Sequence, residues 1–282
     1  MPNAPEQTGT GELLRFENVT IHFDDTVAVN DVSFALRAGE TRVILGAAGS
    51  GKTTLLKAAI GLIHVDAGRV FLLGRDITDL DERQLFDIRA EVGVLFQEGG
   101  LFDSITIFEN VAYPLVNRRI DPLKSGEVKG KVEDALRFVE LGHTLDKYPS
   151  ELSGGMRRRV GIARAVITEP PLVLYDSPTA GLDPITANTI MALIAKERDS
   201  LNMANLIVTQ RYQDGQLMAN FRYNRTHGHL EPVSGNGAGR DGSNPTHTIF
   251  MVMKEGHLIF EGTQAELEAS SDPYITKFVP KR

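Results

Sequence analysis

Short apolar runs alternate with helical stretches along much of the chain. A run rich in β-branched residues at 41–45 is followed by a glycine-rich loop and a helix-favouring segment at 52–60. Two further apolar runs, at 172–176 and 205–209, lie next to helical stretches. Because parallel sheets are built from strands that alternate with helices, this order predicts an α/β fold with a parallel core sheet.

Two other patterns flank this core. Short apolar runs at 14–16, 20–23 and 32–35 are separated by residues that include Asn and Asp. They indicate strands of an antiparallel β edge subdomain. Between residues 97 and 165 the pattern is mostly helical. We therefore predict a helical insertion subdomain there.

The ends of the chain and one internal segment differ from this pattern. Residues 1–12 lack the basic and apolar regions of a signal peptide and predict a disordered N-terminal tail. Residues 224–247 are rich in Gly, Asn, Ser and His, which predicts an exposed, mobile loop. We assign one domain to 13–265 and a C-terminal tail to 266–282.

Composition narrows the classes of function. The formal net charge is -7, so the whole molecule offers no basic surface for nucleic acid, and we expect no nucleic-acid partner. The absence of cysteine excludes disulfides and thiolate metal sites. No apolar run approaches the roughly 18 residues that a membrane helix needs, so any membrane association is expected to be through a partner.

A glycine-rich loop provides the strongest chemical signal, because it matches the phosphate-binding loop pattern between a strand and a helix. Backbone N–H groups of such a loop surround the phosphates, the lysine reaches the β and γ oxygens, and the hydroxyl residue binds Mg²⁺. A merely tight turn is the alternative, and the strand-loop-helix context disfavours it. We assign ATP binding to Gly46, Ala47, Ala48, Gly49, Ser50, Gly51, Lys52, Thr53 and Thr54.

Acidic and hydroxyl groups indicate where the metal binds. Asp176 ends the apolar run 172–176, and carboxyl ends of parallel strands meet at one edge of a sheet. Thr53 and Asp176 are therefore the predicted Mg²⁺ ligands.

A second glycine-containing motif narrows the class. Ser153, Gly154 and Gly155 open a helical stretch and offer a hydroxyl group with bare backbone amides. Together with the phosphate loop, Gln97, Asp176 and the segment 180–183, in this order along nearly the whole chain, they resemble the ABC ATPase family.

That resemblance implies a P-loop NTPase that binds MgATP between two copies in a head-to-tail homodimer. It places Ser153, Gly154, Gly155 and Asp183 against the nucleotide across the dimer interface. It also assigns Gln97 to Mg²⁺ and to catalysis. Phe23 matches the position that stacks on adenine, although a Phe in a short strand is often simply a core residue.

The residues around Gln97 suggest a subfamily. The segments 96–106 and 109–115 resemble the ATPase of Mce-type phospholipid transporters. This resemblance implies an integral-membrane permease and a lipid-binding Mce-type protein as partners, and a location at the cytoplasmic face of the inner membrane. Apolar residues near Gln97 are expected to receive the permease, and ordinary core packing is the alternative.

Two positions depart from the family pattern. Ser177 stands where the family has a catalytic Glu, and Gln210 stands where it has His. A serine hydroxyl is a poor base near neutral pH, whereas a glutamine can orient the attacking water in P-loop GTPases. We therefore assign Ser177, Gln210 and Gln97 to the catalytic positions and expect slow hydrolysis. Glu98 is a further candidate for activating water.

Three functions remain open: a transporter ATPase with slow hydrolysis, a non-hydrolysing ATP-dependent dimerisation module, and a soluble ABC protein of translation or DNA repair. The third is disfavoured, since such proteins usually carry paired cassettes or long coiled coils. His227, His229 and His247 lie in the segment predicted to be a loop. We expect no metal site there, since no acidic or cysteine ligands were recognised at suitable spacing.

Overall fold

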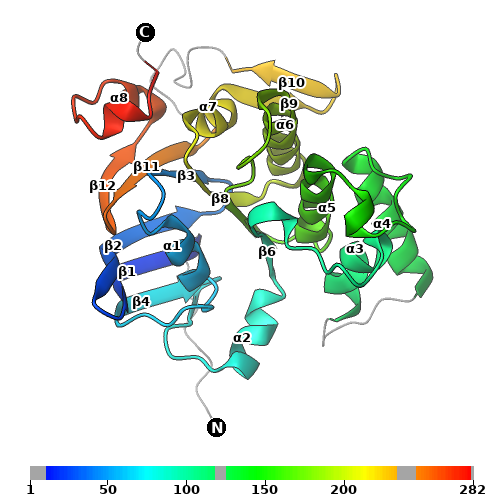
Figure 1. Cartoon of the computed structure of the whole chain (residues 1–282), viewed down its shortest axis with the longest axis horizontal. Coiled ribbons are helices and arrows are strands. Elements are labelled where there is room, and N and C mark those ends of the chain that lie inside the picture. Colours follow the sequence, from blue (N-terminus) through cyan, green and yellow to red (C-terminus); the bar gives the residue numbers. More distant parts are fainter. Residues whose placement is uncertain (1–10, 118–124, 234–245, 281–282) are drawn as a thin grey trace.

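A six-stranded sheet in the order β12-β11-β3-β8-β7-β6 forms the centre of the fold. The computed structural model describes residues 11–117, 125–233 and 246–280. Strands β11, β3, β8, β7 and β6 are parallel to one another, and β12 runs antiparallel at the edge. The predicted α/β fold with a parallel core sheet is confirmed (Figure 1). The strands are β3 (Thr41–Leu45), β6 (Val92–Leu95), β7 (Leu172–Asp176), β8 (Ala204–Thr209), β11 (Thr248–Lys254) and β12 (His257–Gly262).

Strand register brings several chain segments to one edge of this sheet. Leu45 at the end of β3 pairs with Thr209 at the end of β8. Asp176 at the end of β7 pairs with Val208. At the neighbouring strand, Leu95 is the last residue of β6. The loops that follow these four strands therefore start side by side.

A second, antiparallel sheet has the order β2-β1-β4-β5. Its strands are β1 (Glu12–Phe23), β2 (Thr26–Arg37), β4 (Ala67–Leu72) and β5 (Arg75–Asp76). The separate short strands expected at 14–16 and 20–23 are one continuous strand. The reason is that Asn18 adopts a positive φ of 49° at a shift in register and does not end the pairing.

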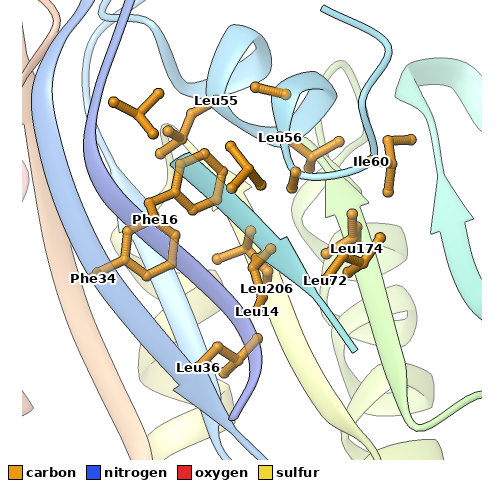
Figure 2. Packing of buried hydrophobic residues seen from close by; sticks show 14 of the residues in the cluster. Leu14, Phe16, Phe34, Leu36, Leu55, Leu56, Ile60, Leu72, Leu174 and Leu206 are labelled. Atoms are coloured by element: carbon orange, nitrogen blue, oxygen red, sulfur yellow. The ribbon is translucent and has the colours of Figure 1, made fainter. Parts of the chain in front are cut away.

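This edge sheet shares a hydrophobic core with the parallel sheet. Phe16 of β1 stacks on Phe34 of β2 with ring centroids 4.9 Å apart. Both belong to a buried cluster that includes leucines of helix α1 (Lys52–Ala58) and of β7 and β8 (Figure 2). The packing fixes the antiparallel subdomain against the helix that follows the glycine-rich loop. Helix α2 (Glu82–Arg89) also packs on this cluster through two residues, Leu85 and Ile88.

Helices α3 (Ile107–Val116), α4 (Ser125–Phe138) and α5 (Gly154–Val166) form the predicted helical insertion. They share a hydrophobic cluster of their own. Thr106 and Glu109 form a capping box that begins α3, in which the Thr106 side chain accepts from the Glu109 N–H. One short 3-10 turn precedes α3, at Gln97–Gly99, and another lies between α4 and α5, at Pro149–Glu151.

The other face of the parallel sheet is covered by α6 (Pro184–Leu201), α7 (Tyr212–Asn220) and the C-terminal segment. Helix α8 (Gln264–Glu268) crosses the boundary that we set at residue 266, and a 3-10 turn follows at Ile275–Lys277. Leu267 and Ile275 are buried in the cluster of this face. The segment assigned as a tail is therefore packed on the domain. Residues 281–282 lie outside the described part of the chain, as do residues 1–10.

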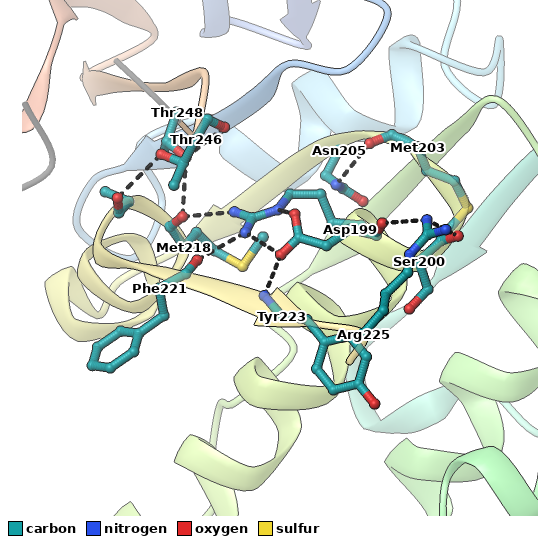
Figure 3. Close-up of polar contacts among 12 residues, drawn as sticks. Asp199, Ser200, Met203, Asn205, Met218, Phe221, Tyr223, Arg225, Thr246 and Thr248 are labelled. Carbon is teal, nitrogen blue, oxygen red and sulfur yellow. Dashed lines mark hydrogen bonds and ion pairs between the residues drawn. The ribbon is translucent and has the colours of Figure 1, made fainter. Parts of the chain in front are cut away.

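The expectation of a loop over 224–247 is wrong for its first part. Strands β9 (Phe221–Asn224) and β10 (His229–Pro232) form a hairpin. It is fixed to the end of α6, because the backbone N–H of Tyr223 donates to the Asp199 carboxylate and Arg225 donates to the carbonyls of Asp199 and Ser200 (Figure 3). Leu230 of β10 also packs against the buried cluster of this face. These polar and apolar contacts depend on segments that are distant in the sequence, so local composition did not reveal them.

The end of the same segment is also attached to the domain. Thr246 is buried and donates a hydrogen bond to the Ala219 carbonyl. Residues 234–245 lie outside the described part of the chain. Among the described residues, no helix is long and apolar enough to cross a membrane.

Candidate nucleotide-binding site

The glycine-rich loop runs from the end of β3 to the start of α1. Lys52, the first residue of α1, donates from Nζ to the backbone carbonyls of Gly46 (2.9 Å) and Ala47 (2.7 Å). A third hydrogen bond joins Nζ to the Ser50 hydroxyl at 3.1 Å. Burial lowers the pKa of Lys52 to about 8, while the Asp176 carboxylate acts in the opposite direction. An ammonium group with an incomplete counter-charge is suited to bind phosphate oxygens.

Close packing explains the glycines of this loop. A Cβ atom on Gly51 would lie 2.2 Å from the Ala28 carbonyl oxygen of β2, and φ of Gly51 is 97°. A Cβ atom on Gly46 would lie 2.5 Å from the Met253 carbonyl oxygen of β11. The loop is thus held between the two sheets. Its outer residues remain exposed; these are Ala47, Ala48 and Gly49.

A hydroxyl group and a carboxylate meet beside the lysine. The Thr53 hydroxyl donates to Oδ1 of Asp176 at 3.1 Å, and Asp176 is 3% exposed. Thr54 follows on the same helix. Mg²⁺ takes oxygen ligands, commonly one or two from protein together with phosphate oxygens and waters. Of the three predicted metal ligands, Thr53 and Asp176 therefore form a pair that fits this ion.

The three residues at the predicted catalytic positions follow strands whose ends adjoin. Gln97 lies two residues after β6, Ser177 directly after β7 and Gln210 directly after β8. Gln97 and Gln210 are exposed and Ser177 is half-buried. The Ser177 hydroxyl donates to the Asp176 carboxylate, with Oγ and Oδ1 3.2 Å apart. In this geometry the Ser177 hydroxyl group is a donor to the Asp176 carboxylate and offers no strong base for water.

The second glycine motif caps helix α5. Ser153 Oγ accepts a hydrogen bond from the Met156 N–H at 3.3 Å. A Cβ atom on Gly155 would lie 2.6 Å from Thr186 Cγ2, so α5 and α6 begin in close contact. An open cavity of about 570 Å³ lies here, between the 153–156 turn and the 181–186 turn.

Asp183 lies on the rim of this cavity and also has a structural role. Its carboxylate accepts from the backbone N–H groups of Ile185 and Thr186, both at 3.0 Å, and so caps α6. A hydrogen bond from the Thr186 side chain, together with these backbone bonds, holds the pKa of Asp183 below its usual range. In Figure 1, α1 and α5 lie well apart on either side of β6. The two glycine motifs of one chain therefore do not form a single site.

Phe23 lies at the end of β1, beside the Asp24 and Asp25 turn. Its side chain is 49% exposed, so it is not the core residue that the alternative interpretation required. Strand β1 pairs with β2, and β2 contacts the phosphate loop at Gly51. The exposed Phe23 ring on β1 is therefore available for stacking.

Sequence reasoning missed two residues at this site. Asp214 of α7 is buried, and its Oδ2 accepts hydrogen bonds from the Thr179 and Thr209 hydroxyls, both at 2.6 Å. Burial raises the pKa of Asp214 above its usual range. Tyr274 touches the phosphate loop from the C-terminal segment. Neither residue belongs to a recognisable motif, and nothing in its local sequence marks it.

Comparison with known proteins decides the family. Residues 29–180 match the ABC transporter family. The intermembrane phospholipid transport system ATP-binding protein MlaF of Haemophilus influenzae is 35% identical over 267 residues, which cover 95% of this chain and 90% of that protein. The chain belongs to the ABC transporter ATPase family.

Other members of the ABC ATPase family are similar over different lengths. The probable ribonucleotide transport ATP-binding protein mkl of Mycobacterium leprae is 37% identical over 199 residues, or 71% of this chain. The match spans 57% of that relative, little more than half its length. A dimeric structure of the ATP-binding cassette MJ0796 bound to ADP and Pi has a TM-score of 0.72 and 26% identity, and covers 89% of this chain and 98% of that one. The ABC ATPase fold predicted from the sequence is confirmed.

Proposed function

We propose that this ABC cassette binds MgATP at a head-to-tail homodimer interface and drives an integral-membrane permease that transports phospholipid. The observation that carries the substrate class is the similarity to MlaF along nearly the full length of both chains. The nearly complete overlap includes the region around Gln97, where the permease contact is proposed. A lipid-binding Mce-type protein is the further partner, and the cytoplasmic face of the inner membrane is the proposed location.

Separation of the two glycine motifs supports the dimer. Lys52, Thr53 and Asp176 would hold the phosphates and Mg²⁺ of one nucleotide. Ser153 opens onto the cavity between the α5 and α6 turns, with Asp183 on its rim. A second copy placed head to tail brings this cavity over the phosphate loop, where bare amides of Gly154 and Gly155 favour a γ-phosphate.

The same geometry supports slow hydrolysis. Ser177 donates its hydroxyl to Asp176 and supplies no carboxylate to accept a proton from water. Gln210, directly after β8, would orient the attacking water instead, and Gln97 would help to hold the Mg²⁺ ion. When bound, Mg²⁺ neutralises charge on the phosphates. Phe23 stacks on adenine.

A non-hydrolysing dimerisation module is the second candidate, and Ser177 is the observation that favours it. In that case ATP binding alone would close the dimer. The two candidates share every binding residue and differ only in turnover.

Purification from detergent-solubilised membranes tests the transport assignment. A tagged copy expressed in its own cell should co-purify with a multi-spanning permease and a Mce-type protein, and phospholipid should be extracted from the purified complex. A complex that contains a permease and a binding protein for amino acids or nucleotides would overturn the lipid assignment while leaving the cassette assignment intact.

A further inference from the structure

The β9–β10 hairpin carries a cluster of potential metal ligands. His227, His229 and Glu231 each offer one ligand atom, and these atoms lie within 4.8 Å of one another. The expectation of no metal site did not take account of Glu231, which follows His229 by two residues. His229 and Glu231 are two residues apart on β10 and so share one face of the strand, and the turn before β10 brings His227 beside them.

Asn224 supports two of these ligands. The Asn224 side-chain oxygen accepts from the backbone N–H groups of Thr226 (2.9 Å) and His227 (3.1 Å), so its amide nitrogen faces the cluster. That nitrogen donates to Glu231 Oε2 at 3.0 Å and lies 3.0 Å from His227 Nδ1. His227 Nδ1 also lies 2.7 Å from Glu231 Oε1.

His229 meets the same oxygen in a similar way. Its Nδ1 lies 3.1 Å from the His227 carbonyl oxygen, which can only accept, so Nδ1 carries the proton. In a neutral imidazole Nε2 then has the lone pair, and it lies 3.4 Å from Glu231 Oε1. His227 Nδ1, His229 Nε2 and Glu231 Oε1 therefore meet at one point of the hairpin. A divalent cation bound there would take the place of any proton that joins these atoms.

We propose that His227, His229 and Glu231 bind a divalent transition-metal ion of the zinc class. Two imidazoles and a carboxylate are a known ligand set for such ions, and a water completes four-coordination. Two ligand atoms that each lie about 2.1 Å from one metal ion are at most about 4.2 Å apart. The ligand atoms here lie within 4.8 Å of one another, so a small rotation of the side chains brings them to metal-binding distance. Two of the ligands also have the supporting contacts that metal ligands usually make. His229 Nδ1 lies 3.1 Å from the His227 carbonyl oxygen, and Glu231 Oε2 accepts from the Asn224 amide.

The hairpin gives this site a rigid support. Tyr223 and Arg225 hold the strand and turn on the end of α6 through Asp199 and Ser200 (Figure 3). The ligands lie on the exposed side of that support. Metal binding would lock the turn and raise the stability of the hairpin. The inference does not depend on the proposed transport function.

Metal titration of the full chain without an affinity tag tests this site. After treatment with EDTA and removal of the chelator, Zn²⁺ is titrated by calorimetry at about pH 7.5, because metal affinity falls when protons compete for the ligands. We expect saturable binding of one ion per chain and a rise in melting temperature with Zn²⁺. Loss of a supporting hydrogen bond alone weakens metal affinity about 10- to 100-fold, so His229→Ala should weaken it at least tenfold.

The conservative variant Glu231→Gln and the exposed control His143→Ala complete the test. Glu231→Gln should also lose Zn²⁺ affinity while keeping the metal-free melting temperature of the wild type, and His143→Ala should bind as the wild type does. Equal affinity in wild type, His229→Ala and Glu231→Gln would overturn the site. Absence of saturable Zn²⁺ binding to the wild type would overturn it as well.

Discussion

The Tyr274 hydroxyl accepts a hydrogen bond from the backbone N–H of Ala47 at 3.0 Å, which links the C-terminal segment to the phosphate loop. The same hydroxyl donates to the Met253 carbonyl oxygen of β11 at 3.2 Å. Ala47 lies on the exposed side of the loop. Tyr274 therefore links this side of the loop to β11 and braces it.

Tyr274→Phe should weaken this support. Loss of the hydroxyl group removes both hydrogen bonds, and each contributes about 0.5–1.5 kcal/mol to stability. We expect a lower free energy of unfolding in urea and weaker ATP affinity by calorimetry. Tyr113→Phe is the matched control, because Tyr113 is 44% exposed on α3. If both variants unfold and bind ATP as the wild type does, the brace has no effect on the loop.

Nucleotide binding should take up a proton at alkaline pH. Burial lowers the pKa of Lys52 to about 8 in the free protein, so the amine is mostly neutral above that pH. Phosphate oxygens favour the charged form and raise the pKa again. ATP affinity should therefore fall as pH rises through about 8, with proton uptake near pH 9 and little near pH 6.5.

Calorimetry in buffers of different ionisation enthalpy measures this uptake. Lys52→Arg is the control, since a guanidinium stays charged at every pH tested and should take up no proton. Identical uptake by the wild type and Lys52→Arg would assign the proton to another group.

Asp214 should matter for stability although no motif contains it. The Thr179 and Thr209 hydroxyls both donate to the Asp214 carboxylate, and both threonines are almost fully buried. Asp214→Ala leaves them without this acceptor, at about 1–3 kcal/mol for each unsatisfied group. Urea unfolding should show a smaller loss for Asp214→Asn, which keeps the shape and one acceptor. Equal stability of all three proteins would mean that these bonds contribute nothing.

The sequence indicated those parts of the molecule whose signals are local. The β3 strand, the glycine-rich loop and α1 follow one another directly, so periodicity and motif were enough. The Thr53 and Asp176 pair could be anticipated because parallel strand ends share an edge. Contacts between distant segments left no such signal: Tyr274 is 227 residues from Ala47.

The hairpin at 221–232 shows why composition was misleading. Few apolar side chains suggested a loop, yet Arg225 and the backbone of Tyr223 attach the hairpin to α6 through polar contacts. Such contacts depend on which groups the fold brings together. For Asp183 the family motif predicted a place near the nucleotide but did not predict that its side chain also caps α6.

Dimer formation should respond to charge at Ser153. Asp and Asn both cap helices about as well as Ser, so Ser153→Asp and Ser153→Asn should keep α5 intact. Only Ser153→Asp places a carboxylate where the partner's γ-phosphate is proposed to bind. Light scattering with ATP should give a dimer for the wild type and Ser153→Asn, and a monomer for Ser153→Asp. Dimers for all three, or none with ATP, would contradict the proposed interface.

Turnover at the Ser177 position tests the central claim most directly, namely that this cassette binds MgATP but lacks the group that activates water. Steady-state phosphate release by the wild type should be about 100- to 10,000-fold slower than in a cassette with the carboxylate, the usual contribution of a general base. Ser177→Glu should raise the rate, and further together with Gln210→His, while ATP affinity changes little. Rapid hydrolysis by the wild type with its permease present, unchanged in Ser177→Ala, would contradict the account and assign water activation to another residue.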